Sequence, residues 1–73
     1  GVRVYPNPAE EQLTVEADEI LQAELYTLGG QKVYSVQRAG RQLAIDIRGL
    51  AAGSYYLRTV TPAGTVTKTV IIK

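Results

Sequence analysis

Six carboxylates gather in the first third of the chain and are the side chains best suited to hold a cation. They are Glu10, Glu11, Glu16, Asp18, Glu19 and Glu24. Calcium takes about six to eight oxygen ligands that converge from one loop, and the EF-hand spacing is absent here. A carboxylate pair for glycoside hydrolysis needs a cleft that desolvates it, and so small a domain has little room for one. We therefore interpret these carboxylates as a solvated strand face and turn, and we expect no metal site.

The other candidate groups lack the partners that catalysis requires. The chain contains no His and no Cys, so Ser35 and Ser54 have no imidazole base to activate them. Gly29-Gly30 lacks the Gly-x-Gly-x-x-Gly spacing of a phosphate-binding loop and is expected to form a turn. By elimination, we expect that the protein is not an enzyme and has no cofactor and no small-molecule substrate.

The five tyrosines could form a stacking platform for sugars or nucleic-acid bases. They are Tyr5, Tyr26, Tyr34, Tyr55 and Tyr56. Each falls in an expected strand, where a half-buried ring with its hydroxyl near the surface is the more common arrangement. The net charge of +1 also excludes a strongly basic nucleic-acid binder, so we expect no nucleic-acid partner.

Length and charge distribution limit the organisation of the chain. The 73 residues suffice for one small domain, which buries only about 60% of its unfolded surface on folding. Residues 1–24 carry an excess of five negative charges and residues 25–73 an excess of six positive charges, so we expect the two parts to lie side by side. No apolar run approaches the roughly 20 residues of a membrane span, and the start lacks the layout of a signal peptide. We expect a single domain, residues 1–73, cut from a longer protein.

Seven short segments have the composition and alternation of β-strands. They are residues 2–5, 11–17, 18–28, 31–37, 41–48, 54–60 and 65–72. Turn signals separate most of them, namely Pro6-Asn7-Pro8, Gly29-Gly30, Ala39-Gly40 and Pro62-Ala63-Gly64. About seven strands with such regular turns predict a small all-β antiparallel sandwich.

Residues 18–28 are compatible with two secondary structures. A helix would place Ala17, Leu21, Leu25 and Leu28 on one face, whereas a strand would place Leu21, Ala23 and Leu25 on one face. We favour the strand, because a lone short helix in a strand-built domain of this size would leave a sheet uncovered.

The last two segments form a hairpin that ends the chain. In its first strand, Tyr55, Leu57 and Thr59 are expected on one face and Tyr56, Arg58 and Val60 on the other. In its second strand, Val66, Val70 and Ile72 are expected to share a face. A final strand at a sheet edge presents unpaired N–H and C=O groups to which a receptor can add a strand. The Lys73 ammonium and the terminal carboxylate would then mark a chemically unique end.

Several motifs occur together in a defined order along the chain. They are Val4-Tyr5-Pro6-Asn7-Pro8-Ala9, Leu13-Thr14-Val15, Leu25-Tyr26-Thr27-Leu28-Gly29-Gly30, Leu50-Ala51-Ala52-Gly53-Ser54-Tyr55-Tyr56-Leu57, and Thr67-Lys68-Thr69-Val70-Ile71-Ile72-Lys73. As an ordered set that spans the chain, they resemble the type A C-terminal sorting domain of type IX secretion cargo. The resemblance implies an immunoglobulin-like sandwich at the C-terminus of a larger exported protein.

The same resemblance implies a function and partners. The domain would act as a non-catalytic address that is recognised by the type IX translocon and shuttle components and directs the N-terminal cargo domain in cis across the outer membrane. A sortase-like signal peptidase would then remove it during cell-surface attachment. The protein would pass through the periplasm of a Gram-negative bacterium and reach the outer-membrane surface or the extracellular medium.

Site residues follow from the resemblance position by position. Translocon recognition would involve Lys68, Val70, Ile71, Ile72 and Lys73, with Gly53 and Tyr55 beside them. Tyr5, Pro6, Asn7 and Pro8 would shape the N-terminal motif near the cut. An exposed edge strand would also allow strand exchange between copies, which gives a homodimer.

Two other functions compete with sorting. A cell-surface adhesion or carbohydrate-binding sandwich predicts an exposed aromatic platform or a cation site. It also predicts that residues added after Lys73 have no effect, whereas a sorting domain predicts that an added tail blocks function. A passive spacer predicts no phenotype from a change at a binding face or from an added tail.

Overall fold

The computed structural model describes residues 1–73 as five β-strands with no helix. The strands are β1 (Arg3–Tyr5), β2 (Gln12–Thr27), β3 (Lys32–Asp46), β4 (Gly53–Thr61) and β5 (Gly64–Ile72). The all-β antiparallel prediction is therefore confirmed, and residues 18–28 form a strand as expected. No helix is available to cross a membrane.

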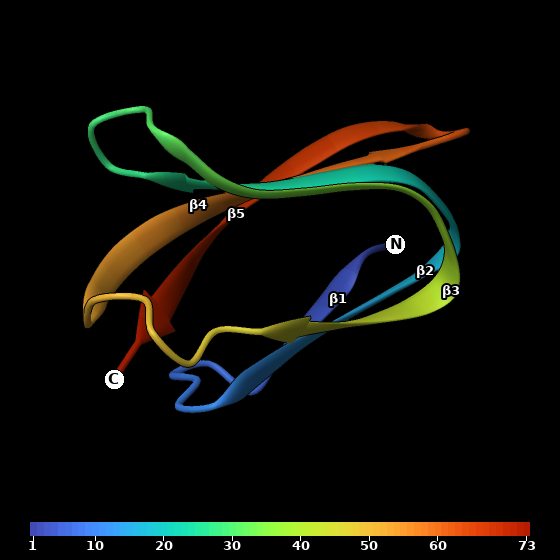
Figure 1. The fold of residues 1–73 in the computed structure, drawn as a ribbon. Helices are drawn as coiled ribbons and strands as arrows, with labels where there is room; N and C mark the ends of the chain where they lie inside the picture. The colour runs from blue at the N-terminus through green and yellow to red at the C-terminus, as the bar shows by residue number, and fades with distance from the viewer.

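The predicted number of strands was wrong, because β2 and β3 each join two predicted segments. The backbone at Ala39-Gly40 does not reverse as a turn would. Arg38 and Gly40 instead adopt positive φ angles of 56° and 74°, and the pairing register shifts around Ile20 on the neighbouring strand. Extra residues of this kind bend a strand and increase its twist without ending it. Figure 1 shows β2 and β3 curving together at one end of the molecule.

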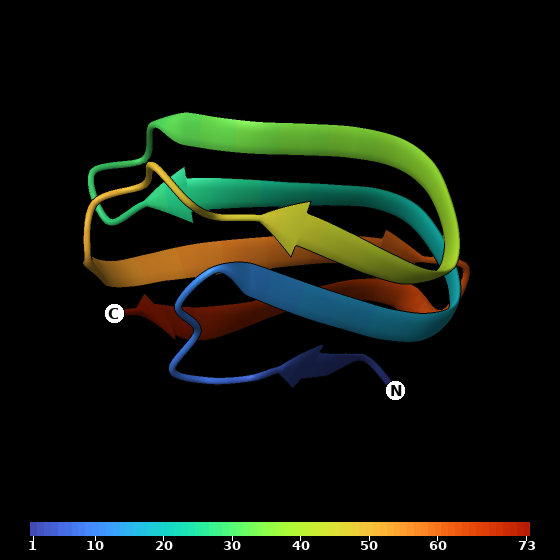
Figure 2. The same cartoon turned by 60° about the horizontal axis from the view of Figure 1, so that its bottom comes forward.

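This bend converts one continuous sheet into two facing layers (Figures 1 and 2). In one layer, the first half of β2 pairs with β1 and with the second half of β3. In the other layer, the second half of β2 pairs with the first half of β3 and with β4, which pairs with β5. The seven predicted segments are thus found within five strands, of which β2 and β3 contain two segments each, and the predicted sandwich is confirmed.

The core lies between the layers and is formed by alternate residues of the facing strands. It comprises Ala9, Leu13, Val15, Ile20, Ala23, Leu25, Ile45, Ile47, Tyr55, Leu57, Val70 and Ile72. Two apolar residues that were expected to share a face with core residues are themselves exposed. Leu21 is 38% exposed, because the register shift at the bend places its neighbour Ile20 in the core instead. Val66 is 36% exposed, because β5 lies at an edge of its layer.

Both predicted hairpin turns are confirmed. At Gly29-Gly30, the Thr27 N–H donates to the Gln31 carbonyl (2.9 Å), and Gly30 takes a φ of +91° that favours glycine. The second turn places Pro62 and Ala63 between β4 and β5. Proline suits this loop, because no ladder hydrogen bond is needed from its nitrogen.

Exchanging Ile20 and Leu21 for alanine tests the register at the bend. Ile20→Ala should lower the free energy of unfolding by about 2–5 kcal/mol, because it removes a fully buried side chain and leaves a cavity. Leu21→Ala is the matched control and should change it by about 0.5 kcal/mol or less. Urea denaturation followed by circular dichroism measures both. Equal losses, or a larger loss for Leu21→Ala, would contradict the register.

Candidate functional site

The predicted recognition residues at the end of the chain divide between core and surface. β5 is an edge strand that pairs along its length only with β4. Val70 and Ile72 point into the core, whereas Ile71 and Lys73 are exposed. Because successive strand residues face opposite sides, only alternate members of this run are accessible in the folded domain.

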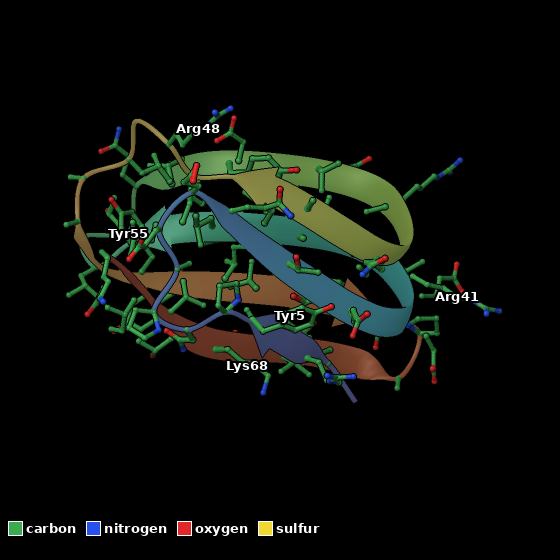
Figure 3. The ribbon with its side chains drawn as sticks, turned by 90° about the horizontal axis from the view of Figure 1, so that it is seen from below. Tyr5, Arg41, Arg48, Tyr55 and Lys68 are labelled. Atoms are coloured by element: carbon green, nitrogen blue, oxygen red, sulfur yellow. The ribbon has the colours of Figure 1, made fainter.

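The other predicted recognition residues divide in the same way. Tyr55 is buried, and its hydroxyl donates a hydrogen bond of 2.6 Å to the Ala51 carbonyl. Gly53 is exposed, and so is Lys68, whose side chain extends into solvent (Figure 3). Lys68 nevertheless pairs with the buried Leu57 and therefore lies on the inner side of its layer.

The N-terminal motif lies directly against the end of β5. The Asn7 side chain accepts a hydrogen bond from the Ile71 N–H (2.9 Å) and donates one to the Thr69 carbonyl (3.3 Å). Ala9 is fully buried and forms a parallel bridge with Ile72. Its N–H donates to the Ile71 carbonyl (2.8 Å), and its carbonyl accepts from the Lys73 N–H (2.8 Å). Residues 6–9 therefore cover the outer edge of β5, and we call them the edge clasp.

The sequence of the edge clasp explains this arrangement. Pro6 and Pro8 have no N–H, so their backbone cannot continue a ladder of hydrogen bonds. The side-chain amide of Asn7 carries one acceptor and a donor group, like a peptide unit. It therefore makes the hydrogen bonds to β5 that the backbone between the two prolines does not make. The peptide bonds that precede Pro6 and Pro8 are both cis. Ala9 then resumes regular pairing and is small enough to be enclosed.

Both ends of this contact were predicted from the sequence, but as separate features. Pro6, Asn7 and Pro8 were expected near a cut, and residues 70–73 were expected in recognition. These positions are more than 60 residues apart, as the Asn7 to Ile71 hydrogen bond shows with a separation of 64. Asparagine between two prolines was the available signal, because such a side chain is well suited to replace a missing backbone partner.

A small apolar patch lies on the outer face beside the end of β5. Tyr56 is 42% exposed and Ile71 is 38% exposed. Tyr56 pairs with Thr69, so Ile71 is its diagonal neighbour on the same face and within reach of an aromatic ring. We call Tyr56 and Ile71 the terminal patch. It lies next to Lys73, whose ammonium is 3.9 Å from the Glu10 carboxylate.

The exposed tyrosines do not form one broad platform. Tyr5 pairs with Thr14 in the three-stranded layer, whereas Tyr56 lies on the outer face of the other layer. Tyr26 is the cross-strand neighbour of Tyr56, but its hydroxyl donates to Glu24 (2.9 Å). No group of three or more acidic side chains is placed to hold a metal ion.

Three of the six carboxylates, Glu10, Glu16 and Glu24, form ion pairs, and Glu24 has the most enclosed one. Its side chain is 5% exposed on the outer face of the four-stranded layer. Lys32 Nζ and Arg58 Nη1 each lie 3.0 Å from one of its oxygens. The hydrogen bonds from Lys32 and then Tyr26 lower the pKa of Glu24 below its ordinary value of 4.5. Both cations come from the positive part of the chain, as the charge distribution predicted.

Substitution of Asn7 tests the edge clasp. Asn7→Ala should lower the free energy of unfolding by about 1–2 kcal/mol, because two hydrogen bonds to the edge are lost. The Ile71 amide should exchange its hydrogen faster, as measured by NMR. Asn7→Asp keeps the acceptor and should leave that amide protected. Unchanged Ile71 exchange in Asn7→Ala would show that the contact does not hold the edge.

Stability should depend on pH through Glu24. Because the folded pKa of Glu24 is lowered, the charged carboxylate stabilises the fold above pH 4.5, and this contribution disappears as pH falls through the folded pKa. Glu24→Gln should therefore reduce the urea midpoint clearly at pH 7 and less at pH 3. Glu19→Gln, at an exposed carboxylate without an ion pair, is the control and should have little effect at pH 7. A Glu24→Gln effect that is as large at pH 3 as at pH 7 would contradict this prediction.

Comparison with solved structures shows where this fold occurs. The chain is similar to part of PorZ, described as an essential bacterial surface component of the type-IX secretion system of Porphyromonas gingivalis. The TM-score is 0.80 and the sequence identity 20%, over 100% of this chain and 11% of PorZ. At this identity the likeness shows the fold alone, and the chain corresponds to a small part of that protein.

Comparison with sequence families is more specific. The family described as the secretion system C-terminal sorting domain matches residues 3–73. No curated protein matches the sequence. The match includes β1, the edge clasp, both hairpins and the last strand. The chain therefore belongs to the family of secretion system C-terminal sorting domains, the sorting signals of type IX secretion.

Proposed function

We propose that residues 1–73 form the C-terminal end of a longer exported protein and that the folded domain is what the type IX machinery recognises. Membership of the family implies export across the outer membrane and interaction with secretion machinery. The observation that carries the proposal is the edge clasp, which holds residues 69–73 in one conformation. An ordered end binds a receptor without the entropy loss of ordering a flexible tail.

The recognition surface should consist of the exposed members of the predicted set. Ile71 and Lys73 offer an exposed apolar side chain and an exposed cation on either side of the buried Ile72, and Tyr56 enlarges the apolar part. Gly53 lies opposite Ile72 at the same end of the hairpin, where the lack of a side chain lets a partner approach the backbone. The contribution of the buried members would be to stabilise the conformation of this surface; they are Tyr55, Val70 and Ile72.

Removal of the domain fits a cut on the cargo side of β1. A peptidase needs an accessible, extended backbone, and Gly1 is exposed before β1 begins at Arg3. A cut within the edge clasp would instead require Ala9 to leave the core. We therefore propose that the sortase-like signal peptidase acts ahead of β1, which leaves Tyr5, Pro6, Asn7 and Pro8 with the released domain.

The route follows from the same proposal. The cargo, attached in cis ahead of Gly1, would cross the periplasm with its sorting domain folded, meet the shuttle and translocon components, and reach the cell surface or the medium. Strand exchange remains a proposal for a homodimer, with the two-residue loop Pro62-Ala63 as the hinge through which β5 would swap.

A non-catalytic role is supported by the chemistry of the enclosed acid. Glu24 already accepts hydrogen bonds from Lys32, Arg58 and Tyr26, so its oxygens are not available to a substrate. No cofactor is needed for recognition of a folded surface.

Export of a reporter tests the proposal. A signal-peptide-bearing reporter is fused ahead of Gly1 in a bacterium that has type IX secretion, and its periplasmic and extracellular fractions are compared. The intact domain should export the reporter. Ile71→Ser combined with Lys73→Ala should reduce export about tenfold, the effect of losing roughly 1.4 kcal/mol of binding.

The matched control is Leu21→Ser, which removes an apolar side chain of equal exposure (38%) at the bend, away from the last strand. This variant should be exported normally. Equal export of all three proteins, with folding confirmed by circular dichroism, would contradict recognition through the exposed end of β5.

A further inference from the structure

The edge clasp covers only the second half of β5. β1 is three residues long, and the chain then crosses to β5 at Ala9, opposite Ile72. In an antiparallel edge strand, alternate residues direct their N–H and C=O groups away from the neighbouring strand. Ile71 directs both groups to the clasp, so Thr67 and Thr65 belong to the same outward set. Their backbone groups have no partner, because β5 pairs elsewhere only with β4.

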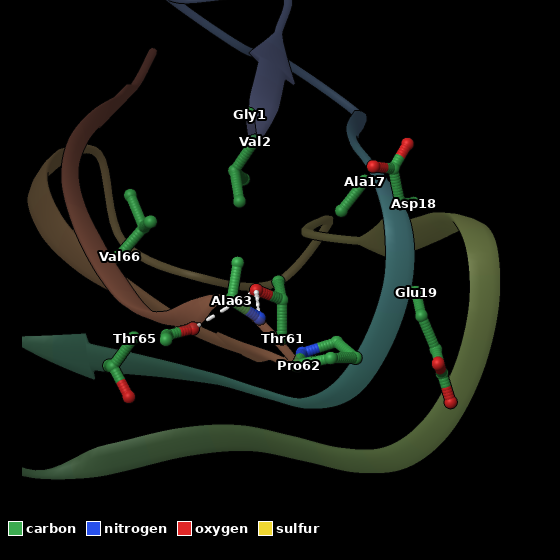
Figure 4. Close-up of a pocket in the computed structure, with 11 residues that line it drawn as sticks. Gly1, Val2, Ala17, Asp18, Glu19, Thr61, Pro62, Ala63, Thr65 and Val66 are labelled. Atoms are coloured by element: carbon green, nitrogen blue, oxygen red, sulfur yellow. Dashed lines mark hydrogen bonds between the residues drawn. The ribbon is translucent and has the colours of Figure 1, made fainter.

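A cavity opens beside this uncovered half of β5. It has a volume of about 310 Å³ and lies between the start of the chain, the bend of β2 and the β4–β5 turn. Figure 4 shows the side chains of Val2, Ala17, Ala63 and Val66 converging on it, whereas Asp18 and Glu19 point away from its centre. Apolar side chains therefore line part of the cavity, and Val66 of the unpaired edge is one of them.

The uncovered half also carries a cation without an ion pair. Lys68 lies on the inner side of the layer, two residues from Val66 and on the same face. No carboxylate lies within 4.0 Å of it, although most of the other cations have such partners. An inward-pointing charge on an edge strand discourages pairing between identical copies. Residues 64–68 contain no carboxylate that a second copy could offer to Lys68.

We propose that this half of β5 accepts an extended peptide from a partner as an additional strand. Thr65 and Thr67 would supply the backbone hydrogen bonds to a peptide that runs parallel to β5. One apolar side chain of the peptide would enter the cavity beside Val66, and a carboxylate two residues toward the C-terminus of the peptide would pair with Lys68. The period of two in a strand places both peptide side chains on the inner face. The inference does not depend on the sorting role, since it rests on the free edge, the cavity and the unpaired cation.

A five-residue peptide with blocked ends and the sequence Thr-Val-Thr-Glu-Thr is a direct probe. It copies residues 65–69 with glutamate in place of lysine. Titration into the ¹⁵N-labelled domain should shift the amide resonances of Thr65, Thr67, Val2 and Ala63 and slow exchange at Thr65 and Thr67. Val66→Asp places a charge at the cavity wall and should weaken binding at least about tenfold.

Charge reversal distinguishes the proposed pairing with Lys68 from nonspecific peptide binding. The peptide Thr-Val-Thr-Lys-Thr should bind the domain about fivefold more weakly than the glutamate peptide, because it faces Lys68 with a like charge. The Lys68→Glu variant should reverse this preference. Val66 and Lys68 are both exposed, and the NMR spectra of the Val66→Asp and Lys68→Glu variants report whether the fold is kept.

Several outcomes would overturn the proposal. They are no saturable shift with millimolar peptide, shifts confined to the terminal patch or to β3, equal binding of the two peptides, and self-association that already covers Val66. The reporter assay is unaffected by these results, since it tests Ile71 and Lys73 in the other half of β5.

Discussion

The structure depends on how the outward backbone N–H and C=O groups of the last strand, β5, find hydrogen-bond partners. A strand at the edge of a sheet exposes backbone donors and acceptors that must find partners, and β5 finds them in a segment that contains two prolines. Asn7 replaces the missing peptide unit with its side-chain amide, and Ala9 completes the pairing beside Ile72. This contact ties the start of the domain to its end, and it keeps the last residues from fraying.

The same contact orders residues 69–73, which contribute side chains both to the core and to the surface. A domain of 73 residues has a core of twelve buried apolar residues, and Val70 and Ile72 are two of them. Ile71 and Lys73, which alternate with them, face outward. A change to the inward residues of this strand therefore acts first on folding, whereas the outward residues remain accessible on the surface of the folded domain.

The bent pair of β2 and β3 decides which parts of the other strands are covered. Because each of these strands runs through both layers, the two layers are joined by continuous backbone at the bend and by the edge clasp at the opposite end. The first half of β5 lies between these two closures. This position explains why Val66 and Lys68 are exposed on the inner side of a layer whose neighbouring residues Leu57 and Thr59 are buried.

The sequence by itself determined the strand character of almost every segment, the two hairpins at Gly29-Gly30 and Pro62-Ala63-Gly64, and most of the core, because alternation and turn chemistry are local properties. Its ordered motifs also indicated the family. The tertiary structure decided three things that depend on distant contacts. The register shift at the bend joined the predicted segments and placed Ile20 in the core instead of Leu21. Pairing at the edge brought Asn7 to Ile71, and alternation within β5 then fixed which terminal residues face outward. Each of these follows from the need to pair backbone groups between strands, and no local pattern specifies which distant residue will supply the partner.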